Sequence, residues 1–281
     1  MDKPVFAEIR KWTRNGISVE YGLAGRADAP VLLLLHAIRT TKMLFAGIVP
    51  ELARHYRVIA VDLRGHGGSA GAGEYSFAAI VDDLVGLLDA EGVERATVAA
   101  ASFAAVPAQL LAVREPWRIA RLILMDGGFY RLGEMPGFDL AKTVQRLADT
   151  RFASVQEAER QFADRYGGGN LPHGWMAAEL ERKEDGGCGY RLAKEAFAAY
   201  FREYAAFDKE ALFSSIPCPV LLLLADERLL PDDEQRAFIR DAAAFYRHSV
   251  ARADVRTIPG SLHLLMVTHP EETVKAIRTF A

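Results

Sequence analysis

The chain has 281 residues and a formal net charge of −3, with 51% hydrophobic and 25% charged residues. These fractions are typical of an ordinary globular protein, and the length suits one domain with an insertion or two modest domains. The charge balance argues against a basic nucleic-acid surface or an acidic solvating tail. Two cysteines, Cys188 and Cys218, are too few for a disulfide framework and lack metal-ligand spacing.

The first residues lack the apolar stretch of a secretory signal, and the apolar run at 31–35 is too short to span a bilayer. We therefore expect a cytoplasmic protein that binds neither membrane nor nucleic acid. Its expected partner is a small-molecule substrate, and the expected oligomeric state is a monomer or a homodimer. We expect neither a metal nor a cofactor.

Two strand-like runs open the chain at 5–12 and 17–21, and Asn15-Gly16 between them favours a tight hairpin turn. Short apolar runs follow that do not alternate with polar residues, as is typical of parallel strands buried on both faces. These runs cover residues 31–35, 58–61, 96–101 and 122–125.

Segments with apolar residues at helical spacing separate these runs, at 42–55 and 77–91. Alternating strands and helices indicate crossover units in a mostly parallel, doubly wound α/β sheet. The strand pattern resumes at 219–224 and 255–258, with helices predicted at 233–248 and from Pro270 onward.

Between these two parts lies a stretch in which only helices are predicted. Ser154-Val155-Gln156-Glu157 is a capping-box pattern at the start of one helix. Glycine-rich breaks occur at 167–170 and 185–187. We therefore predict a core formed by residues 1–130 and 214–281, with an all-helical insertion at 131–213.

The predicted strand at 96–101 ends at Ser102, where a helix begins. A serine at such a position is a candidate nucleophile, because free backbone N–H groups at the helix start can hold a developing oxyanion. The usual motif is Gly-x-Ser-x-Gly, since the turn is sharp and the neighbouring backbones crowd it. Both glycine positions are alanine here, Ala100 and Ala104.

Chemistry in open parallel sheets collects at the carboxyl ends of the strands. Candidate side chains follow several of the predicted strands or lie in the loops after them: His36, Asp62, Ser102, Asp126, Asp226, Glu227 and His263. The order serine, acid, histidine is the chain order of one known catalytic triad.

With these motifs the chain resembles the α/β-hydrolase family, in the branch with a helical cap. Residues 62–69 match the family's Asp-x-Arg-Gly-x-Gly-x-Ser loop in full, and this is the most specific match. His36-Ala37 corresponds to the family's His-Gly, Ser102 to the nucleophile, and residues 260–263 to the Gly-x-x-His that carries the histidine. The resemblance covers nearly the whole chain, although the cap matches only in being helical.

The resemblance implies that Ser102 is the nucleophile and His263 the general base. The family's acid usually follows the strand at 220–224, which favours Asp226 over Glu227. Asp126 is a third option, because some members carry the acid after the preceding strand of the core. The resemblance also implies an oxyanion hole formed by the backbone N–H groups of Ile38 and Phe103.

Other residues of these motifs have a structural interpretation. His36 is expected to pack beneath the oxyanion loop, and Asp62, Arg64 and His66 to hold a turn through local hydrogen bonds. The insertion is rich in aromatic residues, most of which are expected to pack it together while some line a pocket over Ser102. These residues are Phe138, Phe152, Phe162, Tyr166, Trp175, Phe197, Tyr200, Phe201, Tyr204 and Phe207.

The leading hypothesis is a serine hydrolase that cleaves an ester, lactone or related acyl bond of a small apolar or aromatic substrate through an acyl-enzyme. One alternative uses the same triad for hydrolysis of a carbon–carbon bond in a diketone, or for perhydrolysis. Another alternative is a non-hydrolytic biosynthetic enzyme or a small-molecule binding protein on a hydrolase scaffold, suggested by the altered turn around Ser102.

Overall fold

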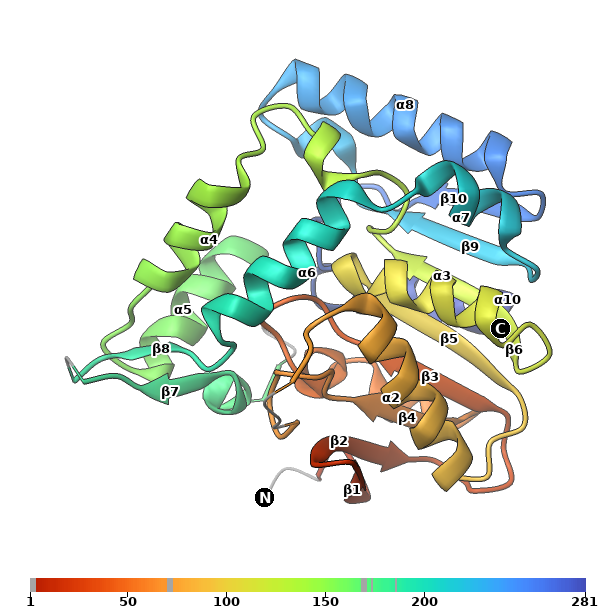
Figure 1. The fold of residues 1–281 in the computed structure, drawn as a ribbon, viewed down its shortest axis with the longest axis horizontal. Helices are drawn as coiled ribbons and strands as arrows, with labels where there is room; N and C mark the ends of the chain where they lie inside the picture. The colour runs from red at the N-terminus through yellow and green to blue at the C-terminus, as the bar shows by residue number, and fades with distance from the viewer. Residues whose placement is uncertain (1–3, 70–72, 168–170, 173, 185) are drawn as a thin grey trace.

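A computed structural model describes residues 4–69, 73–167, 171–172, 174–184 and 186–281. Its central sheet has the spatial order β1-β2-β4-β3-β5-β6-β9-β10 (Figure 1). In chain order these strands are β1 (Glu8–Arg14), β2 (Ile17–Ala24), β3 (Val31–Leu35), β4 (Arg57–Val61), β5 (Ala96–Ala101), β6 (Ile119–Met125), β9 (Val220–Leu224) and β10 (Ala253–Thr257). The chain therefore has the predicted α/β fold.

The strand pairings agree with the apolar patterns. β1 and β2 pair in antiparallel fashion, as do β2 and β4, and the remaining neighbours are parallel. Strands β3, β5 and β9 are almost completely buried because helices cover both faces of the sheet. The first hairpin turns at Asn15 and Gly16, whose φ angles of 51° and 79° confirm the predicted turn.

Two apolar layers enclose the sheet. Helices α2 (Phe77–Ala90), α3 (Ala105–Arg114) and α8 (Asp233–Ser249) contribute to the layer on one face. Helices α1 (Val49–Leu52), α9 (Leu265–Thr268) and α10 (Pro270–Phe280) contribute to the layer on the other. Parallel strands need this double cover, and it directs their carboxyl ends toward one common edge.

The single helix predicted at 42–55 is divided. Residues 42–45 form a 3₁₀ turn, η1 (Lys42–Phe45), whose N-cap is Thr41. A separate short helix, α1, follows, with Pro50 in its first turn. Proline has no backbone N–H to continue an existing helix, but it fits the first turn of a new one. The apolar periodicity therefore spans two elements.

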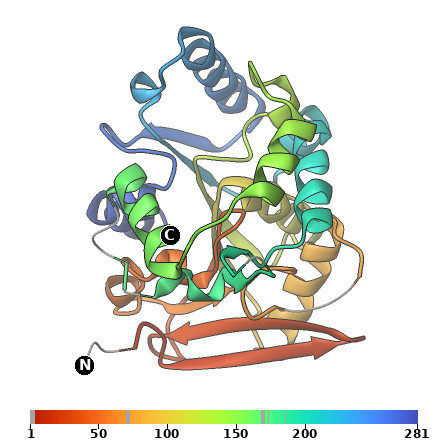
Figure 2. The same ribbon diagram turned by 90° about the vertical axis from the view of Figure 1, so that its left-hand side faces the viewer.

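Most of the insert, defined here as the segment between β6 and β9, lies beyond the edge formed by the carboxyl ends of the strands, whereas its last helix, α7 (Lys209–Ser215), packs against α3 and α8 (Figure 1). Seen from that side, its green and teal segments lie in front of the sheet (Figure 2). Its elements are η3 (Leu132–Glu134), α4 (Leu140–Asp149), α5 (Val155–Tyr166), η4 (Trp175–Ala178), β7 (Leu180–Arg182), β8 (Cys188–Tyr190), α6 (Lys194–Ala206) and α7 (Lys209–Ser215). The division of the chain at residues 130 and 214 into core and cap stays a prediction.

The expectation of an all-helical insert is wrong in one place. Strands β7 and β8, of three residues each, pair in antiparallel fashion. Strands this short contain too few residues for an alternating pattern to show in the sequence. The glycine-rich breaks predicted at 167–170 and 185–187 fall partly on residues 168–170 and 185, which lie outside the described residues.

The predicted start of α5 is confirmed. The Ser154 hydroxyl accepts a hydrogen bond from the Glu157 N–H at 3.2 Å, and the Glu157 carboxylate accepts one from the Ala153 N–H. Both contacts satisfy donors that a helix start would otherwise leave open. Within the described part of the chain, no helix is long and apolar enough to cross a membrane.

Candidate active site

Ser102 stands at a sharp turn between strand and helix. Strand β5 ends at Ala101, and the 3₁₀ turn η2 (Ser102–Ala104) leads into α3. The φ angle of Ser102 is 55°, a left-handed value that costs a non-glycine residue about 1–3 kcal/mol. Ala100 and Ala104 are fully buried on either side, so the structure accommodates alanine at both positions that glycine usually holds.

A glycine that leaves room for the Ser102 backbone lies just after the neighbouring strand, β6. A Cβ atom on Gly127 would lie 2.2 Å from the Ser102 carbonyl oxygen and 2.5 Å from its Cα. These are backbone atoms that cannot rotate away. The turn at Ser102 therefore depends on the absence of a side chain at Gly127.

We expect Gly127→Ala to lower the free energy of unfolding by about 1–3 kcal/mol, because its methyl group overpacks against the Ser102 backbone. Urea unfolding measures this loss. Gly73→Ala is the matched control, since its Cβ would make only ordinary side-chain contacts at 3.4 and 3.5 Å. Equal stability of the two variants would contradict the close approach at Ser102.

Ser102, His263 and Asp126 form one chain of hydrogen bonds. The His263 Nε2 atom lies 2.9 Å from the Ser102 hydroxyl oxygen, and its Nδ1 atom lies 2.6 Å from Asp126 Oδ2. Asp126 directly follows β6, and its other carboxylate oxygen accepts the Ala225 N–H at 2.9 Å. The ends of β5 and β6 and the loop after β10 thus meet, as expected for parallel strands.

The preference for Asp226 as the acid is wrong in this geometry. Asp226 is buried at the start of the 3₁₀ turn η5 (Glu227–Leu229). Its carboxylate accepts two hydrogen bonds from the Arg228 guanidinium, at 2.7 and 2.8 Å. Hydrogen bonds from Arg228 and from the Gly260 N–H hold the pKa of that carboxyl far below its usual range. Asp226 therefore fixes the backbone of the histidine loop, and neither it nor Glu227 is the partner of His263.

Several polar groups in the loops beneath the site are held by hydrogen bonds. The His36 Nε2 atom accepts the Leu63 N–H at 2.9 Å, so its Nδ1–H donates to the Ala37 carbonyl at 2.7 Å. Burial lowers the pKa of His36 to about 3, which keeps the ring neutral. The Asp62 carboxylate accepts hydrogen bonds from the backbone N–H and from the ammonium group of Lys42, both at 2.7 Å. These contacts hold turns, as the sequence indicated.

Arg64 and His66 have similar roles. The Arg64 guanidinium donates two hydrogen bonds to Asp83, at 2.8 and 2.6 Å. The His66 ring stacks on Phe103 and Tyr200, with centroid distances of 5.8 and 6.2 Å. Burial lowers its pKa to about 3 as well. Phe103 directly follows Ser102, so this stack fixes the residue whose N–H the sequence assigns to the oxyanion hole.

A cavity of about 380 Å³ lies between the sheet edge and the insert. Ser102, His263 and the loop residues Ala37, Ile38, Arg39 and Thr40 line the side of the core. Five of the aromatic residues predicted in the insert line the opposite side: Phe152, Phe162, Tyr166, Phe201 and Tyr204. Ile38, the other proposed oxyanion donor, therefore faces the same cavity as Ser102.

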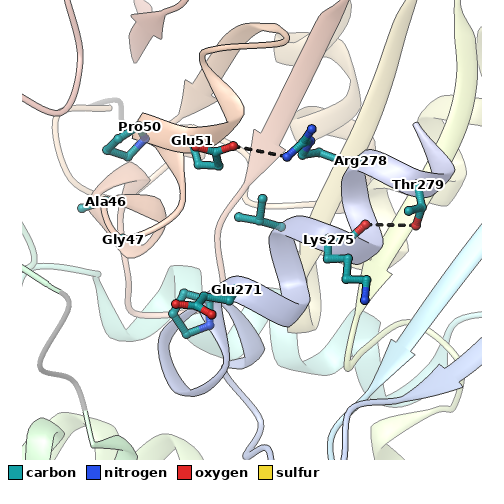
Figure 3. A pocket seen from close by; sticks show the side chains of 10 residues that line it. Ala46, Gly47, Pro50, Glu51, Glu271, Lys275, Arg278 and Thr279 are labelled. Atoms are coloured by element: carbon teal, nitrogen blue, oxygen red, sulfur yellow. Dashed lines mark hydrogen bonds and ion pairs between the residues drawn. The ribbon is translucent and has the colours of Figure 1, made fainter.

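A larger cavity, of about 830 Å³, is a groove between α1 and α10 (Figure 3). Its walls include Glu51 and Arg278, which form an ion pair at 3.2 Å. None of the residues that line it belongs to the hydrogen-bonded chain of Ser102, His263 and Asp126. Among the described residues no cluster of histidine, cysteine and carboxylate side chains has a geometry suited to a metal ion.

Sequence reasoning missed several polar side chains in the wall of the site cavity, notably Arg39, Arg165 and Glu179. In the sequence, a place near the site was indicated only for Arg39, which comes two residues after Ala37 of the His36-Ala37 motif. Glu179 is 4% exposed, and neither of its carboxyl oxygens has a hydrogen-bond partner among the described residues. Burial raises the pKa of Glu179 well above its usual value, which favours the protonated form of the carboxyl.

We expect Glu179→Gln to change how stability depends on pH. A carboxyl with a raised folded pKa stabilises the fold fully below its unfolded pKa near 4.5, and this contribution is lost as pH rises through the folded value. The stability of the wild type relative to Glu179→Gln should therefore fall from pH 4.5 upward, by at most about 1.4 kcal/mol per pH unit.

Urea unfolding of both proteins at pH 5 and pH 8 provides the measurement. Asp62 and Glu159 raise the pKa of Glu179 and Arg39 lowers it, and all three are unchanged in the variant. A stability difference that stays constant with pH would show that Glu179 is ionised in the folded protein.

Comparisons with known proteins identify the family and the fold. A model of the alpha/beta hydrolase family matches residues 32–276. An uncharacterized hydrolase of Saccharomyces cerevisiae is 30% identical over 122 residues, which cover 43% of this chain and 42% of that protein. The chain thus spans about two fifths of the length of such curated relatives.

Two further comparisons extend over almost the whole chain. A 2-(acetamidomethylene)succinate hydrolase of Mesorhizobium japonicum is 25% identical over 261 residues, covering 91% of this chain and 89% of the relative. The crystal structure of E-2-(acetamidomethylene)succinate hydrolase superposes with a TM-score of 0.74 at 21% identity, over 97% of this chain and 98% of that one. This second likeness shows the shared fold.

Proposed function

Because the chain belongs to the α/β-hydrolase family, we propose that it is a serine hydrolase that cleaves an ester, a lactone or a related acyl bond. The observation that carries this proposal is the continuous hydrogen-bonded chain from Ser102 through His263 to Asp126. Nucleophile, base and orienting carboxylate in this order are the parts that acyl transfer needs.

The first step is attack of the Ser102 oxygen on the substrate carbonyl. His263 Nε2, at 2.9 Å, takes the hydroxyl proton as the new C–O bond forms, and then passes it to the leaving group. Asp126 holds Nδ1–H at 2.6 Å, which fixes the tautomer and stabilises the imidazolium. Water, activated in turn by His263, hydrolyses the acyl-enzyme.

The developing oxyanion would be held by the backbone N–H groups of Phe103 and Ile38. Phe103 follows the nucleophile at the start of a helical turn, and Ile38 lines the same cavity as Ser102. Loss of one such donor typically lowers the rate by about 10²–10³-fold. The aromatic wall of the insert supports a small substrate with apolar or aromatic parts.

Covalent labelling tests the nucleophile. A fluorophosphonate probe is expected to label the wild type, and Ser102→Ala to abolish both labelling and turnover of p-nitrophenyl acetate, lowering kcat by about 10³-fold or more. Ser214→Ala, at an exposed serine of α7, is the matched control and should retain both. Labelling that persists in folded Ser102→Ala would disprove the assignment.

A pair of conservative variants tests the acid. Asp126→Asn should lower kcat by about 10³–10⁴-fold, because an amide cannot hold the productive tautomer of His263. Asp226→Asn should lower kcat by less than about 10-fold, since it leaves the His263–Asp126 bond in place. A larger loss of kcat in Asp226→Asn than in Asp126→Asn would show that Asp226 is the acid.

The same proteins separate the alternative activities. Hydrolysis of a diketone with no ester activity would identify a carbon–carbon hydrolase, and halide oxidation dependent on peroxide and a carboxylic acid would identify a perhydrolase. Tight binding of a small molecule without turnover, unaffected by Ser102→Ala, would identify a binding protein.

A further inference from the structure

The wall of the site cavity contains two guanidinium groups that no ion pair within the described part of the chain neutralises. Arg39 and Arg165 both line the cavity, and neither has a carboxylate within ion-pair distance among the described residues. By contrast, the cations beneath the site are paired: Lys42 with Asp62 and Glu20, and Arg64 with Asp83. The cations of the cavity wall thus differ from those beneath the site, which have carboxylate partners.

Arg39 is the more constrained of the two cations. It follows Ile38 in the loop after β3, and its backbone φ angle of 60° is left-handed, a conformation that is unfavourable for a non-glycine residue. Its Nε–H is buried and has no acceptor among the described residues. A buried donor without an acceptor, on a residue with an unfavourable backbone angle, is costly to maintain, which favours a role in binding.

Tyrosine rings hold both guanidinium groups. The Arg39 guanidinium lies 5.0 Å from the centroid of the Tyr190 ring, and that of Arg165 lies 5.3 Å from the centroid of the Tyr166 ring. Both cations also interact electrostatically with the Tyr190 hydroxyl, which places them in one neighbourhood. Stacking leaves the edges of a guanidinium free to donate hydrogen bonds.

Glu179 lies in the same wall, but it forms no hydrogen bond or ion pair with either arginine among the described residues. Burial raises the pKa of its carboxyl, although Arg39 lowers it. Two guanidinium groups without an ion-pair partner in the described part of the chain make this wall complementary to a planar anion.

We propose that the cavity binds a substrate that carries a carboxylate in addition to its scissile acyl bond, with Arg39 as the principal anchor of that carboxylate. Arg165 assists from the exposed side of the cavity, and Glu179 offers a further polar group in the same wall. A guanidinium fork matches the two oxygens of a carboxylate with two parallel hydrogen bonds. This inference rests on the proposed hydrolase function and adds a negative charge to the small apolar or aromatic substrate expected from the sequence.

Matched pairs of esters test it. In the first pair, 4-acetoxybenzoate carries a carboxylate on its leaving group, and 4-acetoxybenzamide carries an uncharged amide there. In the second pair, mono-4-nitrophenyl adipate carries the carboxylate on its acyl group, and 4-nitrophenyl adipamate carries an amide there. In each pair only the carboxylate differs, so the ratio of the two kcat/KM values isolates its recognition.

For at least one pair, the wild type should prefer the carboxylate by about 10-fold or more, mostly through KM. Arg39→Gln should lower that ratio by about 10-fold and Arg165→Gln by a smaller factor. Arg160→Gln, at an exposed arginine of the same helix α5 that does not line the cavity, is the matched control and should keep the wild-type ratio.

Ratios at or below one for both pairs in the wild type, or an unchanged ratio in folded Arg39→Gln, would overturn the proposal. Calorimetry with Ser102→Ala separates this outcome from failure of the hydrolase function, because it measures binding without turnover. Tighter binding of the carboxylate than of the amide supports the inference even where no ester is cleaved, and equal binding overturns it.

Discussion

The site depends on the close contact between two backbones, that of Ser102 at the end of β5 and that of Gly127 just after β6. Ser102 keeps a left-handed φ of 55° although it is buried, and a Cβ on Gly127 would come within 2.2 Å of its carbonyl oxygen. Parallel strands place their ends side by side, so a turn this sharp needs an empty position on the neighbour. The same strand end carries Asp126, so the packing that supports the turn at Ser102 also places this carboxylate beside the histidine loop.

Charge is distributed unevenly around the site. Beneath it, the buried ions are paired and hydrogen-bonded, as burial of charge requires. In the wall of the cavity, Arg39 stacks on Tyr190 without a carboxylate partner in the described structure, and the carboxyl oxygens of Glu179 have no hydrogen-bond partner there. Polar groups left without protein partners at a cavity wall are available to a ligand, and this contrast distinguishes the supporting layer of the site from its binding surface.

Most of the fold could be predicted from sequence because its signals are local. Runs such as 31–35 and 220–224 are apolar throughout, which is the mark of a strand buried on both faces. The predictions failed where the pattern was too short or was interrupted. Pro50 divides a periodic stretch into two elements, and β7 and β8 are too short to show alternation.

The α/β sheet, the insertion, the position of Ser102 at a strand end and that of His263 in the loop after a later strand can be predicted from sequence, because each follows from the pattern of neighbouring residues. Which of Asp126 and Asp226 lies against His263 follows only from the folded chain. Both follow buried strands and both are short acids, but packing directs one toward His263 and the other toward Arg228 and Gly260. The tertiary structure also brought Arg39 and Glu179 into one cavity wall, since residues so far apart in the chain share an environment only after folding.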